Sequence, residues 1–139
     1  MAYWLFKSEP DAWSWDDQVK KGDIGEEWDG VRNYQARNNM RAMEIGDLGF
    51  FYHSIKEKRV VGVVKVIALA HPDSTTDDPR WECVDLAAVG PFPKPVTLDD
   101  CKAEPRLANM VLVNNTRLSV QPVTAEEWTT ICAMGGNSA

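Results

Sequence analysis

The stretch from Trp28 to Tyr34 holds side chains that could bind a flat ligand. Trp28 offers an aromatic face for stacking, and Asn33 offers an amide that donates and accepts hydrogen bonds in one plane. A planar heterocycle has a π-face and a polar edge, so it needs these two kinds of contact. The same residues also fit a structural role, with Trp28 in the core and Asn33 as the N-cap of the helix that follows. Burial and capping are the commoner fates of such residues.

Polar side chains also follow two apolar runs that are typical of buried strands. Lys7, Ser8 and Glu9 come after the first run and offer an ammonium, a hydroxyl and a carboxylate, and His53 and Ser54 end the second run. Side chains fixed at a strand end can face a pocket, although a solvated strand end is the commoner explanation. If the two strand ends meet, their serine, histidine and glutamate side chains are the one candidate for a nucleophile with a base.

The sequence contains no motif that carries its own catalytic mechanism. The two histidines, His53 and His71, lack a metal-ligand spacing such as H-E-x-x-H, and there is no P-loop, dinucleotide-binding glycine motif or nucleophile elbow. The three cysteines are far apart and odd in number, which indicates reduced core thiols rather than a zinc site or a disulfide framework. We therefore expect a cytoplasmic protein that is not an enzyme and that binds no metal or cofactor.

Hydrophobic patterns predict the elements that must position these side chains. Apolar, aromatic and β-branched runs predict strands over 3–7, 50–54, 60–70, 81–89, 110–113 and 117–120. Capping residues predict helices that begin after Ser14, Asn33, Thr97 and Thr124. The prolines at 91, 93 and 95 are expected to break regular structure, and 72–79 is expected to form a surface loop.

The order of these elements favours one α+β domain over residues 1–139. Connections are irregular and hairpin-like rather than repeating βαβ units, which favours a mixed, partly antiparallel sheet or a small barrel. A chain of 139 residues, 44% of them hydrophobic, can close one core but not two comfortable domains. The opening apolar run is too short for a signal-peptide core or a membrane span. We expect a monomer with no membrane partner.

The charge distribution bears on whether nucleic acid is a partner. The formal charge of −6 argues against a protein that coats nucleic acid by electrostatics alone. Between residues 30 and 60, however, there are six basic and three acidic residues, so this segment is locally basic. Candidate phosphate contacts in it are Arg37, Arg41, Lys56, Lys58 and Arg59. The same cations also fit a solvated helix face and turn.

Four blocks of the sequence, in order along nearly the whole chain, resemble the EVE-domain family. They are Tyr3–Pro10, Trp28–Asn38, Gly46–Asp47 with Phe51–Ser54, and Arg117–Val123. Four ordered blocks of this length are far more specific than a lone motif. The resemblance implies a fold of the PUA-like superfamily, a mixed and partly open β-barrel flanked by short helices, which is similar to the fold of YTH domains.

The resemblance also implies a reader of modified bases in DNA or RNA that holds a flipped base in an aromatic and polar pocket. Carried over by motif, the pocket lining is Lys7, Ser8, Glu9, Trp28, Gly30, Val31, Arg32, Asn33, His53 and Ser54. Arg117 and Ser119 are candidates for its rim, with Arg117 as a further contact to the nucleic-acid backbone. Stacking on an aromatic side chain contributes roughly 1–3 kcal/mol per base, which offsets much of the cost of flipping.

The leading hypothesis is therefore a non-catalytic module that binds a modified nucleobase in DNA or RNA. The alternative is a sensor or enzyme for a free planar molecule, such as a nucleoside, that uses the same pocket without a polymer. The formal charge of −6 favours this alternative somewhat. Binding to a polymer weakens steeply with salt and binding to a nucleoside hardly at all, so salt dependence separates the two.

Overall fold

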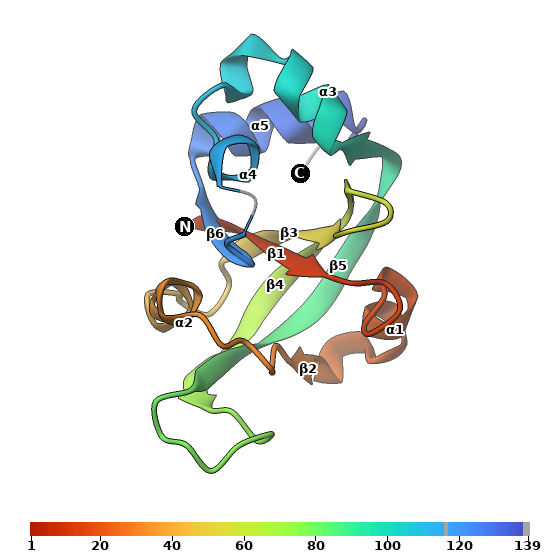
Figure 1. The fold of residues 1–139 in the computed structure, drawn as a ribbon. Coiled ribbons are helices and arrows are strands. Elements are labelled where there is room, and N and C mark those ends of the chain that lie inside the picture. Colours follow the sequence, from red (N-terminus) through yellow and green to blue (C-terminus); the bar gives the residue numbers. More distant parts are fainter. Residues whose placement is uncertain (116, 138–139) are drawn as a thin grey trace.

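A six-stranded mixed sheet is the centre of the fold in this computed structural model, which describes residues 1–115 and 117–137 (Figure 1). The strands are β1 (Tyr3–Ser8), β2 (Glu26–Glu27), β3 (Leu48–His53), β4 (Arg59–Pro72), β5 (Glu82–Thr97) and β6 (Val120–Val123). They lie in the order β2-β5-β4-β3-β1-β6. β1 and β3 are parallel, and the other neighbours are antiparallel. The predicted α+β fold, a mixed and partly open β-barrel flanked by short helices, is confirmed as a mixed sheet that, over the described residues, does not close into a barrel.

Short helices lie on both sides of this sheet. They are α1 (Trp15–Lys20), α2 (Tyr34–Arg41), α3 (Leu98–Ala103), α4 (Val111–Asn114) and α5 (Ala125–Met134), with 3-10 turns η1 (Gly22–Ile24) and η2 (Pro105–Leu107). Figure 1 shows α3, α4 and α5 gathered at one end of the molecule and α1 and α2 nearer the other. Capping boxes at Ser14, Thr97 and Thr124 start α1, α3 and α5, as predicted. Within the described chain, every helix is too short or too polar to cross a membrane.

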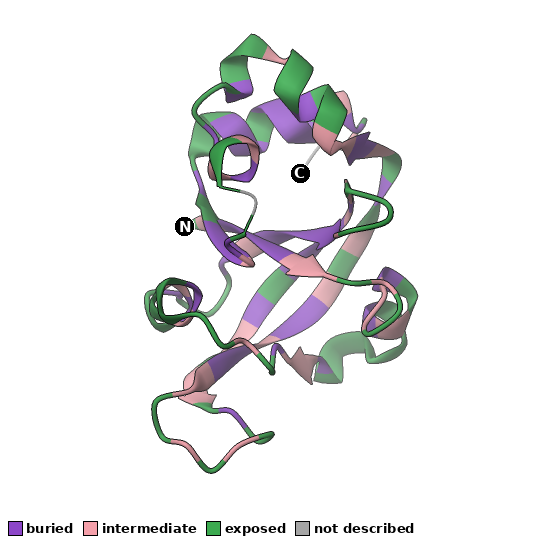
Figure 2. Cartoon of the chain, in the orientation of Figure 1, coloured by how far each residue is buried: buried purple, intermediate pink, exposed green. Residues whose placement is uncertain are grey.

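Side chains of β1 and β3 alternate between two hydrophobic clusters on opposite faces of the sheet. Trp4 and Phe6 lie in one cluster with Trp28 and Phe51, whereas Leu5 lies in the other. Leu5 and Phe6 are both fully buried, so β1 is covered on both faces, as its continuous apolar run predicts. Figure 2 shows the buried residues concentrated along these central strands. A rigid central strand therefore carries the polar residues that follow it.

The prediction that three prolines break regular structure is wrong. Strand β5 continues through Pro91, Pro93 and Pro95 to Thr97. These prolines lie beyond the two residues of β5 that pair with β2, and the pairing of β5 with β4 is irregular beside them. Proline is tolerated at such edges and irregularities because no N–H donor is required there.

The predicted strands near the C-terminus also need correction. Residues 110–113 were expected to form a strand, but Val111–Asn114 forms the helix α4. Its turn is closed by the Asn114 side-chain amide, which donates to the carbonyl oxygens of Ala108 and Met110. A short apolar run does not distinguish a strand from a buried helical turn. The strand expected over 117–120 begins at Val120 and ends at Val123.

Candidate ligand-binding pocket

A cavity of about 410 Å³ lies beside the C-terminal end of β1. This volume is in the usual range of small-ligand sites, roughly 300–1,000 Å³. Seven of the predicted pocket residues line it: Lys7, Ser8, Glu9, Trp28, Gly30, Val31 and Arg32. Ser119, predicted at the rim, lines it too, and the sequence interpretation missed Ala12, Trp13, Glu26 and Asp29. The cavity thus lies between the end of β1 and the loop that precedes α2.

Trp28 is both a core residue and a wall of this pocket. Its ring meets Phe6 and Phe51 edge to face, with centroids 5.4 and 5.5 Å apart. Its backbone N–H donates to the carbonyl oxygen of Val84 at 2.9 Å, which ties the loop to β5. Only 7% of the residue is exposed, so Trp28 offers the cavity a small, rigid part of its surface. Trp28 is therefore a core residue, as one of the two sequence interpretations predicted. This role does not exclude contact with a ligand.

Trp13 is the second tryptophan of the pocket, and it is less buried than Trp28. Its indole N–H donates to Oε1 of Gln18 at 3.0 Å, and the fully buried Gln18 donates from Nε2 to the carbonyl oxygen of Leu86 at 2.9 Å. The Ser8 hydroxyl donates to the carbonyl oxygen of Trp13 at 2.5 Å. The backbone of Trp13 is thus tied to β1, and its ring is tied through Gln18 to β5.

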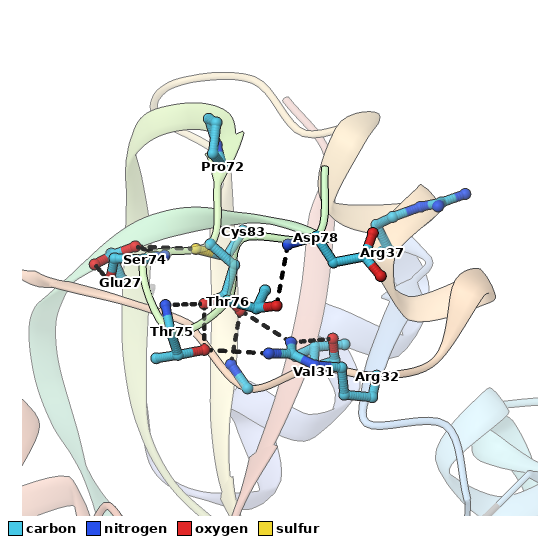
Figure 3. A network of polar contacts seen from close by, with 12 residues as sticks. Glu27, Val31, Arg32, Arg37, Pro72, Ser74, Thr75, Thr76, Asp78 and Cys83 are labelled. Carbon is cyan, nitrogen blue, oxygen red and sulfur yellow. Dashed lines mark hydrogen bonds and ion pairs between the residues drawn. The ribbon is translucent and has the colours of Figure 1, made fainter. Parts of the chain in front are cut away.

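The loop before α2 is fixed by the buried carboxylate of Asp73, which lies in the connection between β4 and β5. One oxygen of Asp73 accepts from the Gly30 N–H at 2.9 Å and from Nη1 of Arg32 at 3.1 Å. The other accepts from the backbone N–H of Thr75 at 2.8 Å and from its hydroxyl at 2.5 Å. Figure 3 shows Arg32 turned toward Thr75 in this network. Asp73 therefore joins the hairpin loop to the pocket wall.

Electrostatics agree with a structural role for Asp73. Burial alone would raise the pKa of this carboxyl, but the hydrogen bonds from Thr75, Gly30 and Arg32 lower the pKa to about 2. Gly30 has φ of +77°, a backbone conformation that favours glycine, so its N–H reaches Asp73 without strain. The segment 72–79 was predicted only as a surface loop. The local signal of its role is the aspartate before Ser74, which is typical of a turn stabilised by its own side chain.

Acidic and basic groups both line the pocket. Glu9, Glu26 and Asp29 supply carboxylates, and Lys7 and Arg32 supply cations. Burial, together with the nearby charges of Asp73 and Glu27, raises the pKa of Asp29, and burial lowers the pKa of Lys7. Each shift favours the neutral form of its group. The lining can therefore donate and accept hydrogen bonds to a polar, uncharged ligand edge.

Three residues predicted for the pocket do not line it. Asn33 is the exposed N-cap of α2, and its side-chain oxygen accepts from the Ala36 N–H at 2.9 Å. His53 is buried, with Nε2 accepting from the Trp15 N–H at 3.0 Å and Nδ1 lying 2.9 Å from Oε1 of Glu57. Ser54 lines a separate cavity of about 350 Å³. Because both ring nitrogens of His53 are engaged, this geometry does not favour His53 as a base for a serine nucleophile.

Three of the six predicted phosphate contacts are paired with carboxylates. Arg41 pairs with Glu82, Lys56 pairs with Asp11, and Arg59 pairs with Glu57. Lys58, Arg117 and Arg37 form no ion pair with a carboxylate within the described residues. The locally basic segment is therefore less basic as a surface than its sequence indicates.

The fold brings together three potential metal ligands that no sequence motif predicted. Ligand atoms of Glu27, His71 and Cys83 all lie within 4.8 Å of one another. A carboxylate, an imidazole and a thiol are ligands that suit a zinc ion. Each also has a protein partner, since the Cys83 thiol donates to Glu27 at 3.5 Å, Glu27 accepts from the Ser74 hydroxyl, and His71 pairs with Asp85. The cluster therefore has a structural role of its own, as a polar link between β2, β4 and β5.

The pair of His71 and Asp85 predicts a pH dependence of stability. The hydrogen bond between Nε2 of His71 and Asp85, 2.7 Å long, raises the pKa of His71 in the folded state. The stability that the ion pair of His71 and Asp85 gives to the folded protein is therefore fully present below the unfolded pKa of His71, about 6.5. It is lost as the pH rises through the folded pKa of His71. We expect His71→Gln to lower the melting temperature more at pH 5.5 than at pH 8.5, with about 0.2–1 kcal/mol at stake. Equal losses at the two pH values would show that the ion pair contributes nothing.

The open mixed sheet, its flanking helices and the pocket at the end of β1 define a small α+β ligand-binding module. The model of the EVE domain matches residues 2–134, and the chain belongs to the EVE-domain family. This confirms the resemblance seen in the sequence.

Known proteins agree with this assignment over most of the chain. A protein of Agrobacterium tumefaciens is 61% identical, with a TM-score of 0.98 over 99% of this chain and 95% of that one. Human thymocyte nuclear protein 1 is 35% identical over 91% of this chain and 71% of its own length. The crystal structure of that human protein with DNA containing 5-methylcytosine superposes with a TM-score of 0.92 at 33% identity, covering 100% of both chains. A YTH domain of Zygosaccharomyces rouxii, 17% identical with a TM-score of 0.59 over 96% of this chain and 86% of that one, shares the fold.

Proposed function

We propose that this chain is a non-catalytic module that binds a modified nucleobase of DNA or RNA, with the base inserted between Trp13 and Trp28. The observation that carries the proposal is the cavity itself, in which two fixed tryptophans meet carboxylates and cations in about 410 Å³. The human relative crystallised with 5-methylcytosine-containing DNA supports the same class of ligand. A base removed from its stack loses a few kcal/mol, and stacking on aromatic side chains contributes roughly 1–3 kcal/mol per base.

The polar lining favours bases that carry an exocyclic amino group. Carboxylates accept hydrogen bonds from the amino groups of cytosine and adenine, and thymine and uracil have none to offer. Glu9, Glu26 and Asp29 are the carboxylates of the pocket. We therefore infer that derivatives of cytosine or adenine are preferred over those of thymine or uracil.

Binding to matched single-stranded oligonucleotides tests this function. The strands differ only at the central base, which is 5-methylcytosine, cytosine, N6-methyladenine, adenine or thymine. Burial of one methyl group contributes about 0.8 kcal/mol, so a methylated strand should bind about fourfold more tightly than its unmodified counterpart. The thymine strand should bind more weakly than any of the others. Equal affinity for all five strands would contradict the proposal.

A further inference from the structure

Two aromatic rings, one exposed and one half-buried, stack on each other beside the pocket. Tyr34 begins α2, Trp81 precedes β5, and their ring centroids are 5.0 Å apart with an interplanar angle of 24°. Tyr34 is 49% exposed. This exposure leaves part of the Tyr34 ring open to a further planar group.

Three arginines surround this pair of rings. The guanidinium carbon of Arg37 lies 4.8 Å from the Tyr34 ring centroid, and that of Arg32 lies 5.5 Å from the Trp81 ring centroid. Nη1 of Arg80 donates to the Tyr34 hydroxyl at 3.0 Å. We call Arg32, Tyr34, Arg37, Arg80 and Trp81 the rim cluster. Since Arg32 also lines the pocket, the rim cluster is continuous with it.

Arg37 differs from the other arginines of the rim cluster in the groups to which its guanidinium donates hydrogen bonds. Arg32 pairs with Asp73 and Arg80 with Asp78, whereas Arg37 donates only to neutral oxygens, the side chain of Asn38 and the carbonyl of Arg80. Within the described residues it has no carboxylate partner. Figure 3 shows its side chain pointing away from the Asp73 network. The guanidinium carbon of Arg37 also lies 6.0 Å from the Trp81 ring centroid. A guanidinium placed beside two rings, with no carboxylate partner among the described residues, can bind a phosphate.

We propose that the rim cluster binds the nucleotide next to the base in the pocket, with Arg37 on its phosphate and the Tyr34 ring under its base. This inference rests on the proposed function and narrows its ligand, because a free nucleoside has neither a phosphate nor a neighbouring base. The ligand is accordingly a strand of nucleic acid. Guanidinium groups and aromatic rings side by side are a common arrangement in single-strand recognition, where every base has a face that can stack.

The test compares two ligands, an oligonucleotide with a central 5-methylcytosine and free 5-methylcytidine. Arg37→Gln should weaken oligonucleotide binding about tenfold, reduce the salt slope by about 1 and leave nucleoside binding unchanged. Tyr34→Leu should weaken oligonucleotide binding by a similar factor, whereas Tyr34→Phe should keep most of it because the ring remains. Arg41→Gln is the matched control, since Arg41 lies one turn further along α2 and is already paired with Glu82.

The outcomes separate this inference from the proposed function. If the wild type prefers methylated strands and the Arg37 and Tyr34 variants bind the oligonucleotide like the wild type, the rim cluster has no role and only this inference fails. If these variants lose the nucleoside as strongly as the oligonucleotide, the rim cluster merely supports the pocket wall and the inference is again overturned. If the wild type does not distinguish modified from unmodified bases, the proposed function fails, and the inference fails with it. Melting temperatures of all variants show whether folding is retained.

Discussion

Replacing Trp28 with alanine is expected to destabilise the protein by about 3–5 kcal/mol as well as to abolish binding. The residue is 93% buried, packs edge to face on Phe6 and Phe51, and lies in the cluster that covers one face of the sheet. Loss of such a ring leaves a cavity that the rigid strands β1 and β3 cannot close. This cost is a large fraction of a typical stability of roughly 5–15 kcal/mol.

Chemical denaturation of Trp28→Ala, Trp28→Phe and Trp13→Ala checks this expectation. Trp28→Phe should recover most of the stability because an aromatic ring still contacts both phenylalanines. Trp13→Ala should cost less stability, since Trp13 is less buried, and should still lower affinity for a methylated strand by about tenfold. A Trp28→Ala variant as stable as the wild type would remove Trp28 from the core. A Trp13→Ala variant with full affinity would remove Trp13 from the binding site.

Replacing Asp73 with alanine is expected to loosen the pocket wall from a distance. Four donors lose their acceptor, and we expect a loss of about 2–3 kcal/mol rather than the sum of four charged hydrogen bonds, because Arg32 and Thr75 are exposed enough to bind water. Affinity for a methylated strand should fall by at least tenfold, since Gly30 and Arg32 line the cavity. The carboxylate does not need to touch the base to have this effect.

Urea denaturation at two pH values, with Asp77→Ala as the control, tests the role of Asp73. Asp77 lies in the same loop and is exposed. The folded pKa of Asp73 is about 2. The ionised carboxylate therefore adds to the free energy of unfolding above its unfolded pKa of about 3.9, and this addition is lost as the pH falls through about 2. The stability difference between the wild type and Asp73→Ala should therefore be full at pH 6 and shrink below pH 3. A constant difference, or an equal effect of Asp77→Ala, would exclude the charge of Asp73 as the cause.

Local signals in the sequence predicted the parts of the structure that local interactions determine. The capping boxes at Ser14, Thr97 and Thr124 satisfy the first turn of a helix with side chains only three residues away. The first strand was predicted because its residues are apolar on both faces. The strand predicted over 110–113 was wrong because a strand and a buried helical turn both bury a short apolar run of this kind.

The parts of the pocket that sequence reasoning missed depend on contacts between distant residues. Trp13 is held through Gln18, whose partner Leu86 is 68 residues further along the chain, and Asp73 holds Gly30 across 43 residues. No spacing rule covers such pairs. Asn33 was predicted for the pocket but does not line it. Its position before a helix also indicated an N-cap, and this local signal was the correct one.

A crystal structure of the protein with a single-stranded oligonucleotide that carries one 5-methylcytosine tests the central claim most directly. We expect the methylated base to lie in the cavity, between the rings of Trp13 and Trp28, with its amino group on a carboxylate of the lining. We also expect the adjacent phosphate to lie at Arg37. A complex in which the base remains stacked on its neighbours outside the cavity, or lies in another pocket, would overturn the proposed function.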